Sequence, residues 1–257
     1  TDLASFEKAA AALKAAGITP IAYGETDKPI ALLCGVQDAL GDRDAIADVV
    51  YGSRTAKIAD TGLGEAAERV KGWADKGWLM ADYEGLSSAD ANAKFLDGGA
   101  GFVFYYSGLV PIDQQNRADF GYFQLTHDDG TMVATGAPAD NLAIGIHSAH
   151  KDAAALLLDF LMSEQAAQIT ADYGYMPLLH QVTSSKGDAL IQDEAAAAQK
   201  TEADNGYVPY FDWTTPTMLD TLGTQAQLLF AGKSSPDQLV TAVQDDVDAF
   251  LAKQPGA

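Results

Sequence analysis

One loop of the sequence combines aromatic rings with a carboxylate, a set of side chains suited to holding a polar ring. Tyr207–Trp213 reads YVPYFDW. The Asp212 carboxylate can accept hydrogen bonds from two hydroxyl groups, and the indole of Trp213 can stack on the C–H-rich face of a sugar ring. A second interpretation of Trp213 is that it fills the core between two helices. The loop therefore indicates a binding surface rather than a reactive centre.

Motifs of catalytic and metal centres are not found. The sequence has no GxSxG, no P-loop, no zinc pattern and no GxGxxG followed by an acid at the right distance. The apolar setting of the single Cys34 (ALLCGV) predicts a buried, inert thiol. The numerous carboxylates leave an acid and base pair for glycoside hydrolysis possible, although no pair is singled out. We therefore expect a protein that is not an enzyme and binds no metal or cofactor. The four histidines do not have the spacing of metal ligands: His127, His147, His150 and His180.

The charge of the chain limits its partners. Among 257 residues, 36 are acidic and 16 are basic, which gives a formal net charge of −20. Such a surface repels phosphate backbones and anionic lipid, so nucleic acid is not an expected partner. Hydrophobic residues make up 47% of the chain, but no apolar run is long enough to span a membrane. The composition predicts a soluble, globular protein with a sizeable core, and the acidity indicates solubility or a salty habitat.

The first half of the chain predicts helices separated by short strands. Helices are predicted over 2–16, with a stop at Gly17, over 30–40, and from Leu63 through Trp73, where the apolar spacing places Trp73 in the core. An S-x-x-D capping box begins another helix at Ser87. Residues 41–60 are predicted to be irregular. Strands are predicted over 18–23, 102–106 and 120–125, the last followed by a turn at 128–130.

The stretch from Thr135 to Leu178 gives the clearest succession of elements. A Gly/Asp turn leads into an apolar run over 142–146 that suits a buried strand, and a helix follows over 153–162. Ser163 is the predicted N-cap of a further helix that stops at Gly174, before Pro177.

The last third of the chain predicts three helices. The first covers 189–199. The next starts near Pro216 with Thr215 as its cap and ends at Gly232. The last begins with a capping box between Ser235 and Gln238, and its predicted buried stripe consists of Leu239, Val243, Val247 and Phe250.

Several of these phrases together resemble the extracellular solute-binding proteins (family 1, sugar-binding, maltose-binding-protein-like) of ABC transporters. The similar phrases are 135–178, the opening LKAAGITPIA and the closing QAQLLFAGKSSPDQLVTAVQDDVDAFL. The resemblance implies an α/β, type II periplasmic-binding-protein fold with ligand held between two lobes. It assigns 1–140 and 188–257 to the C-terminal lobe and 141–187 to the N-terminal lobe. The chain thus looks like a fragment that lacks most of the N-terminal lobe.

The resemblance also implies a set of sugar-binding residues. The polar loop Gly24–Pro29 faces the cleft in that family, with a solvated turn as the alternative. Leu109 stands where the family has a stacking tryptophan, so Tyr105 or Tyr106 supplies the ring instead. Strand alternation points only one of them toward the cleft, and Tyr106 is preferred. Tyr175 lies beside the G-x-x-P exit and has a core role as its alternative. The full set of candidates is Glu25, Lys28, Tyr106, Asp140, Asn141, Tyr175, Asp212 and Trp213.

The function implied by the resemblance is capture of a mono- or oligosaccharide and its delivery to a membrane permease, with hinge closure between the lobes. It implies an extracellular location, in a periplasm or as a cell-surface lipoprotein. If one lobe is missing, the chain is expected to bind sugar weakly and to self-associate through exposed apolar surface. Two other interpretations stay open, a carbohydrate-active hydrolase and a stand-alone interaction module.

Overall fold

The computed structural model of the chain describes residues 1–105, 119–136, 142–173, 175 and 189–254. Contacts divide the chain into two units. The first contains 1–106, 125–137 and 205–257, and the second contains 107–124 and 138–204. Each unit is described by itself.

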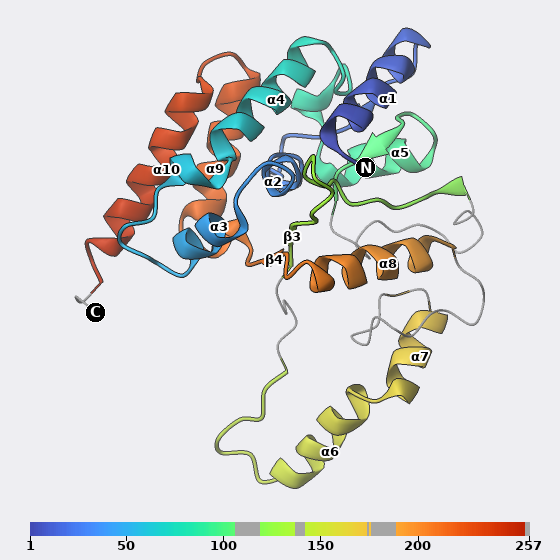
Figure 1. The fold of residues 1–257 in the computed structure, drawn as a ribbon, viewed down its shortest axis with the longest axis vertical. Helices are drawn as coiled ribbons and strands as arrows, with labels where there is room; N and C mark the ends of the chain where they lie inside the picture. The colour runs from blue at the N-terminus through green and yellow to red at the C-terminus, as the bar shows by residue number, and fades with distance from the viewer. Residues whose placement is uncertain (106–118, 137–141, 174, 176–188, 255–257) are drawn as a thin grey trace. The chain divides into compact units, whose positions relative to one another are not determined.

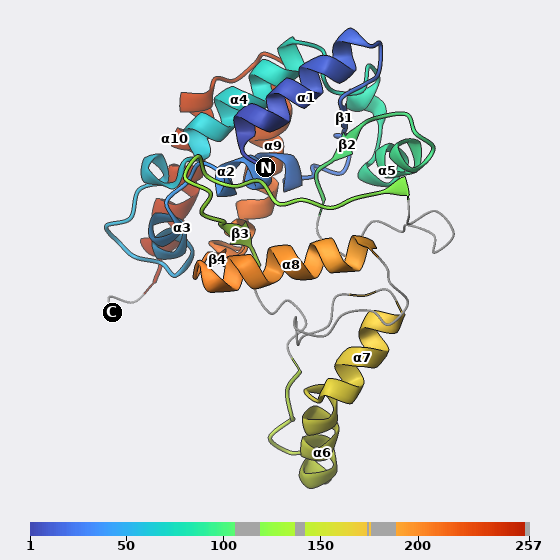
Figure 2. The ribbon, with the colours of Figure 1, turned by 45° about the vertical axis from the view of Figure 1, so that its right-hand side comes forward.

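The first unit consists mainly of helices, and four of them build its centre. The helices α2 (Ala31–Asp38), α4 (Leu63–Asp75), α9 (Met218–Phe230) and α10 (Pro236–Leu251) pack against one another (Figures 1 and 2). The remaining elements are α1 (Leu3–Ala15), α3 (Arg43–Val50), α5 (Ser88–Leu96) and three short 3-10 turns, η1 (Ile58–Thr61), η2 (Tyr83–Gly85) and η4 (Phe211–Trp213).

The described strands are two residues long and pair in parallel. β1 (Ile21–Ala22) pairs with β2 (Phe102–Val103), with Ile21 opposite Phe102. β3 (Ala134–Thr135) pairs with β4 (Tyr207–Val208), with Thr135 opposite Val208. Both pairs join segments far apart in the sequence, as parallel strands require.

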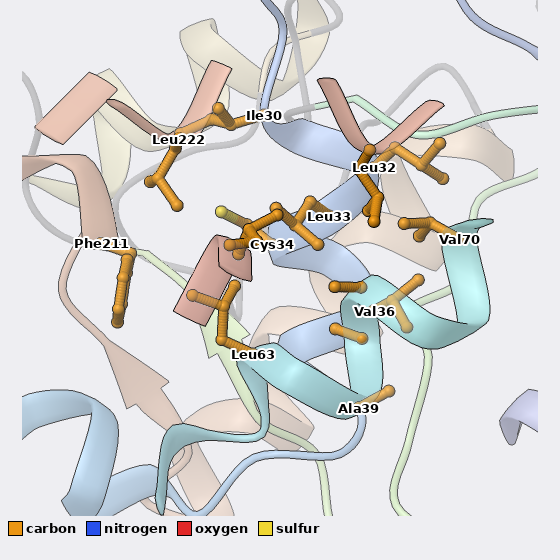
Figure 3. Packing of buried hydrophobic residues seen from close by; sticks show 14 of the residues in the cluster. Ile30, Leu32, Leu33, Cys34, Val36, Ala39, Leu63, Val70, Phe211 and Leu222 are labelled. Atoms are coloured by element: carbon orange, nitrogen blue, oxygen red, sulfur yellow. The ribbon is translucent and has the colours of Figure 1, made fainter. Parts of the chain in front are cut away.

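Helix α2 lies at the middle of the core. Its Leu32, Leu33 and Val36 are at most 2% exposed. Figure 3 shows these side chains radiating from α2, with the Cys34 sulfur on the side of α2 that faces Phe211. Burial raises the pKa of the Cys34 thiol well above its usual value. The predicted burial of Cys34 is therefore confirmed.

Short-range signals located most helices correctly. The two predicted capping boxes are present, with Ser87 and Asp90 at α5 and with Ser235 and Gln238 at α10. Trp73 is 1% exposed, as the apolar spacing of α4 predicts. The helix predicted over 2–16 is α1, and Gly17 adopts the left-handed conformation that ends it.

Four predictions for the first unit were wrong in part. Residues 41–60 are not wholly irregular, because Asp42 caps α3 by accepting a hydrogen bond from the Ala45 N–H. Of the strands predicted over 18–23 and 102–106, only Ile21–Ala22 and Phe102–Val103 are strands among the described residues. Thr215 does not cap α9, which begins at Met218 without a side-chain cap.

The second unit contains α6 (Lys151–Leu161), α7 (Glu164–Asp172) and α8 (Ala189–Ala203). Ser163 caps α7 as predicted. The strands predicted over 120–125 and 142–146 are wrong, because neither segment is paired as a strand in the structure. A strand needs a neighbour for its backbone hydrogen bonds, and hydrophobicity alone cannot provide one. The apolar stripe of α6 is not buried either, since Leu157 is 57% exposed.

In the first unit, Thr215 does not cap α9 but belongs to a hydrogen-bonded cluster that joins α9 to α10. Asp246 of α10 accepts hydrogen bonds from the hydroxyls of Thr215, Thr217 and Thr221 at 2.8, 2.7 and 2.5 Å. These bonds hold the pKa of Asp246 below its usual value, despite the opposing effect of desolvation. The cluster fixes the start of α9, on which the candidate site depends.

We expect Asp246→Asn to lower the free energy of unfolding by about 1 to 3 kcal/mol, because an amide offers three hydroxyl donors only one acceptor oxygen and no charge. Urea denaturation followed by circular dichroism measures this change. Asp248→Asn is the matched control, since Asp248 accepts one exposed hydrogen bond from Gln244 and should cost less than about 0.5 kcal/mol. Equal losses in the two variants would contradict a special role for the threonine cluster.

Candidate functional site

The loop Gly24–Pro29 lies directly on α9. The Lys28 ammonium donates to Asp220 Oδ1 at 2.5 Å and to Thr224 Oγ1 at 2.9 Å. A Cβ on Gly223 would lie 2.4 Å from the Lys28 Cβ, so only glycine allows this approach. The Gln227 amide donates to the Glu25 carbonyl at 2.9 Å. These contacts bind the loop along two turns of α9.

Glu25 is the most unusual side chain of this loop. It is only 8% exposed, and its Oε2 is buried without a hydrogen-bond partner among the described residues. Burial, with a smaller contribution from the charge of Glu84, raises the pKa of Glu25 to about 7. A carboxyl group in this state can donate or accept a hydrogen bond near neutral pH.

Three aromatic rings lie next to Glu25. Tyr23 contacts Tyr83 with ring centroids 6.0 Å apart and Phe230 with ring centroids 5.3 Å apart. Burial raises the pKa of both tyrosines, and the negative charge of Glu25 adds to the shift of each. The Glu25 N–H also donates to the Tyr83 carbonyl at 3.0 Å, which holds the backbone of Glu25 against this aromatic cluster.

The loop at η4 contributes an exposed ring and a second carboxyl group. Trp213 is 51% exposed, so it does not fill the core, and its ring lies 4.9 Å from that of Tyr210. Asp212 is half-buried, and burial raises its pKa. η4 packs against α9, as the loop Gly24–Pro29 does. Both segments therefore lie against α9, the loop with Glu25 and Lys28 and η4 with Asp212 and Trp213.

The other sequence candidates are not brought into this group. Tyr106, Asp140 and Asn141 lie outside the described residues. Tyr175 belongs to the second unit and is 59% exposed, which excludes the core role considered for it.

Residues that the sequence reasoning missed complete the surroundings of the site. Asp220, Thr224 and Gln227 support the loop Gly24–Pro29, and their spacing of four and three residues along one helix face was visible in the sequence. Tyr23 and Tyr83 were missed because only the fold brings them to Glu25.

The described residues hold no group of three or more His, Cys, Asp or Glu side chains placed to bind a metal ion. Within the same residues, no helix is long and apolar enough to cross a membrane. A surface depression between α4 and α10 includes Arg69, but its guanidinium is already paired with Glu7 and Glu65. The site beside α9 is therefore the stronger candidate.

Comparison with known proteins gives structural matches only. No protein-family model and no curated sequence matches the chain. Among solved structures, a chitin oligosaccharide-binding protein matches with a TM-score of 0.75 and 24% identity, over 98% of this chain and 65% of that one. The bacterial solute receptor AcbH, described as preferring β-D-galactopyranose, matches with a TM-score of 0.73 and 16% identity, over 97% and 66%.

A third match is a probable secreted solute-binding lipoprotein from Streptomyces coelicolor, with a TM-score of 0.67 and 20% identity, over 96% of this chain and 63% of that one. The chain thus spans about 65% of the length of the first structure it matches. These structural likenesses, at sequence identities below 25%, establish the fold and nothing further. The fold predicted from the sequence is confirmed, and the chain has the α/β fold of the bacterial sugar-binding solute receptors.

Proposed function

We propose that this chain is part of the substrate-binding component of an ABC importer and that it holds a carbohydrate at the site beside α9. The observation that carries the proposal is that η4 presents an exposed Trp213 ring directly after the half-buried Asp212 in the chain. A sugar offers a C–H face to the ring and hydroxyls to the carboxyl group. The shared fold with sugar-binding receptors supports this assignment.

The mechanism is capture without covalent chemistry. Aromatic faces and polar side chains hold the sugar, and closure of two lobes around it produces the form that a permease recognises. The predicted lobe assignment, with 141–187 in the N-terminal lobe, belongs to this proposal, as do Tyr106, Asp140, Asn141 and Tyr175. An extracellular or lipid-anchored location is supported by the secreted lipoprotein among the structural matches.

Substitution of Trp213 tests the site. We expect Trp213→Ala to weaken carbohydrate binding by about fivefold to thirtyfold, because loss of a stacking platform removes about 1 to 2 kcal/mol. Trp213→Phe keeps a flat ring and should lose less. Calorimetric titration of the product of the complete reading frame that contains this chain measures both. Unchanged affinity in Trp213→Ala would remove Trp213 from the site.

A further inference from the structure

The charged side chains in three segments near α9 are mostly negative. The described segments 23–28, 83–88 and 210–221 contain five carboxylates and a single basic side chain. That basic side chain, Lys28, is paired with Asp220. An anionic ligand would find no unpaired cation in these segments. The carboxylates are Glu25, Asp27, Glu84, Asp212 and Asp220.

Most of these carboxylates are either hydrogen-bonded or exposed to solvent. The Oε2 atom of Glu25 is neither. Asp27 accepts hydrogen bonds from the Ser88 N–H at 2.9 Å and from its hydroxyl at 3.0 Å. Asp220 binds Lys28 and its side chain is 76% exposed. Glu25 is more than nine-tenths buried, and nothing among the described residues hydrogen-bonds its Oε2. A buried carboxylate oxygen without a hydrogen-bond partner is unfavourable, so a cationic donor placed there would be stabilised.

The neighbours of Glu25 also suit a cation. Tyr23 and Tyr83 provide π faces, which attract ammonium groups. Glu84 adds a second negative charge close enough to disfavour the ionised form of Glu25. A cation at this position relieves that repulsion and can take the place of the proton that Glu25 otherwise holds near pH 7.

We propose that Glu25 makes the site selective for an amino sugar, whose ammonium pairs with Oε2 beside Tyr23 and Tyr83. This inference rests on the proposed function and adds the class of sugar to it. The expected affinity is highest for amino sugars, lower for neutral sugars and lowest for uronic acids or sugar phosphates, because like charges repel in a partly desolvated site.

The test compares three oligosaccharides of equal length at about pH 6, where the amine is protonated. The probes are a glucosamine oligomer, an N-acetylglucosamine oligomer and a galacturonate oligomer, titrated by calorimetry into the product of the complete reading frame. We expect the glucosamine oligomer to bind about tenfold more tightly than its N-acetylated counterpart. Glu25→Gln should abolish this preference, so that the glucosamine oligomer binds no more tightly than its N-acetylated counterpart.

Proton release gives an independent readout. Pairing of the ammonium with Glu25 should release up to one proton per glucosamine oligomer bound, seen as a dependence of the binding enthalpy on the buffer, and Glu25→Gln should remove it. Asp27→Asn is the matched control. It removes the same charge from the same loop, but from a carboxylate that already has hydrogen-bond partners. The preference for the glucosamine oligomer and the proton release on its binding should therefore persist.

The outcomes separate this inference from the proposed function. If the neutral oligomer binds and the glucosamine oligomer binds no more tightly, the amino-sugar inference is overturned and sugar binding stands. If Glu25→Gln weakens both oligomers equally, Glu25 only supports the loop, and the inference is again overturned. If no oligosaccharide of any kind binds, both proposals fall.

Discussion

Replacing Trp73 by alanine should lower the free energy of unfolding by about 3 to 5 kcal/mol, the cost of removing a large buried side chain. Trp73 is 1% exposed, and its ring lies 5.1 Å from that of Phe6 and 6.1 Å from those of Trp78 and Phe104. Its indole N–H also donates to Glu7 at 3.0 Å. The substitution leaves a cavity and removes one of two donors to Glu7, the other being the Arg69 guanidinium at 3.2 Å. Urea denaturation followed by far-UV circular dichroism measures the change.

Trp213→Ala is the matched control for this prediction. The same substitution is made, but the ring is 51% exposed, so the loss of stability should be below about 1 kcal/mol. The two tryptophans therefore separate a packing role from a binding role. A loss in Trp73→Ala no larger than that in Trp213→Ala would contradict the core described for the first unit.

Glu25→Gln should stabilise the protein at neutral and alkaline pH, by up to about 3 kcal/mol. Burial raises the pKa of Glu25 from 4.5 to about 7. Below about pH 4.5 the carboxyl group is protonated in both the folded and the unfolded state and contributes no difference. Between 4.5 and 7 folding takes up a proton, so stability falls as the pH rises. Above 7 the folded state carries a buried charge, and the full cost remains.

The measurement is the difference in the free energy of unfolding between Glu25→Gln and the unsubstituted chain, from urea titrations between about pH 4 and pH 8. Taking the difference removes the contribution of Asp38, a second buried carboxyl group whose pKa is raised to about 6. Asp27→Asn serves as the control, since its exposed, hydrogen-bonded carboxylate lacks this penalty. A difference that does not grow between pH 4.5 and 7 would refute the burial of Glu25.

Helix ends were predictable because their determinants lie within four residues of one another. Ser87 with Asp90, Ser163 with the Ala166 N–H, and Ser235 with Gln238 are local hydrogen bonds that the sequence displays directly. The apolar spacing of α4 and α10 is likewise local, and it predicted the burial of Trp73 and Val243.

Strands were less predictable because each depends on a distant partner. Ile21 pairs with Phe102, and Ala134 pairs with Tyr207, so the length of each strand is decided by a segment more than seventy residues away. The run at 142–146 has the composition of a strand, yet Ile146 is 77% exposed in the structure. Composition sets a preference, and pairing decides whether it is realised.

The candidate site was predictable in part for the same reason. Asp212 and Trp213 stand next to each other in the sequence, so their grouping was visible. The burial of Glu25 was not, because it arises from Tyr83 of η2 and from α9, which holds Lys28 through Asp220, a residue 192 positions away. The resemblance indicated the loop Gly24–Pro29, and the structure shows which of its side chains is buried.

The central claim is that a carbohydrate binds beside Trp213, and a fluorescence titration tests it most directly. Trp73 and Trp78 are buried, at 1% and 5% exposure, so an exposed Trp213 is the ring that a ligand can reach. We expect oligosaccharides added to the product of the complete reading frame to change its tryptophan emission in a saturable way, and Trp213→Phe to remove that change. No saturable change with any sugar, together with no heat of binding in calorimetry, would contradict the account.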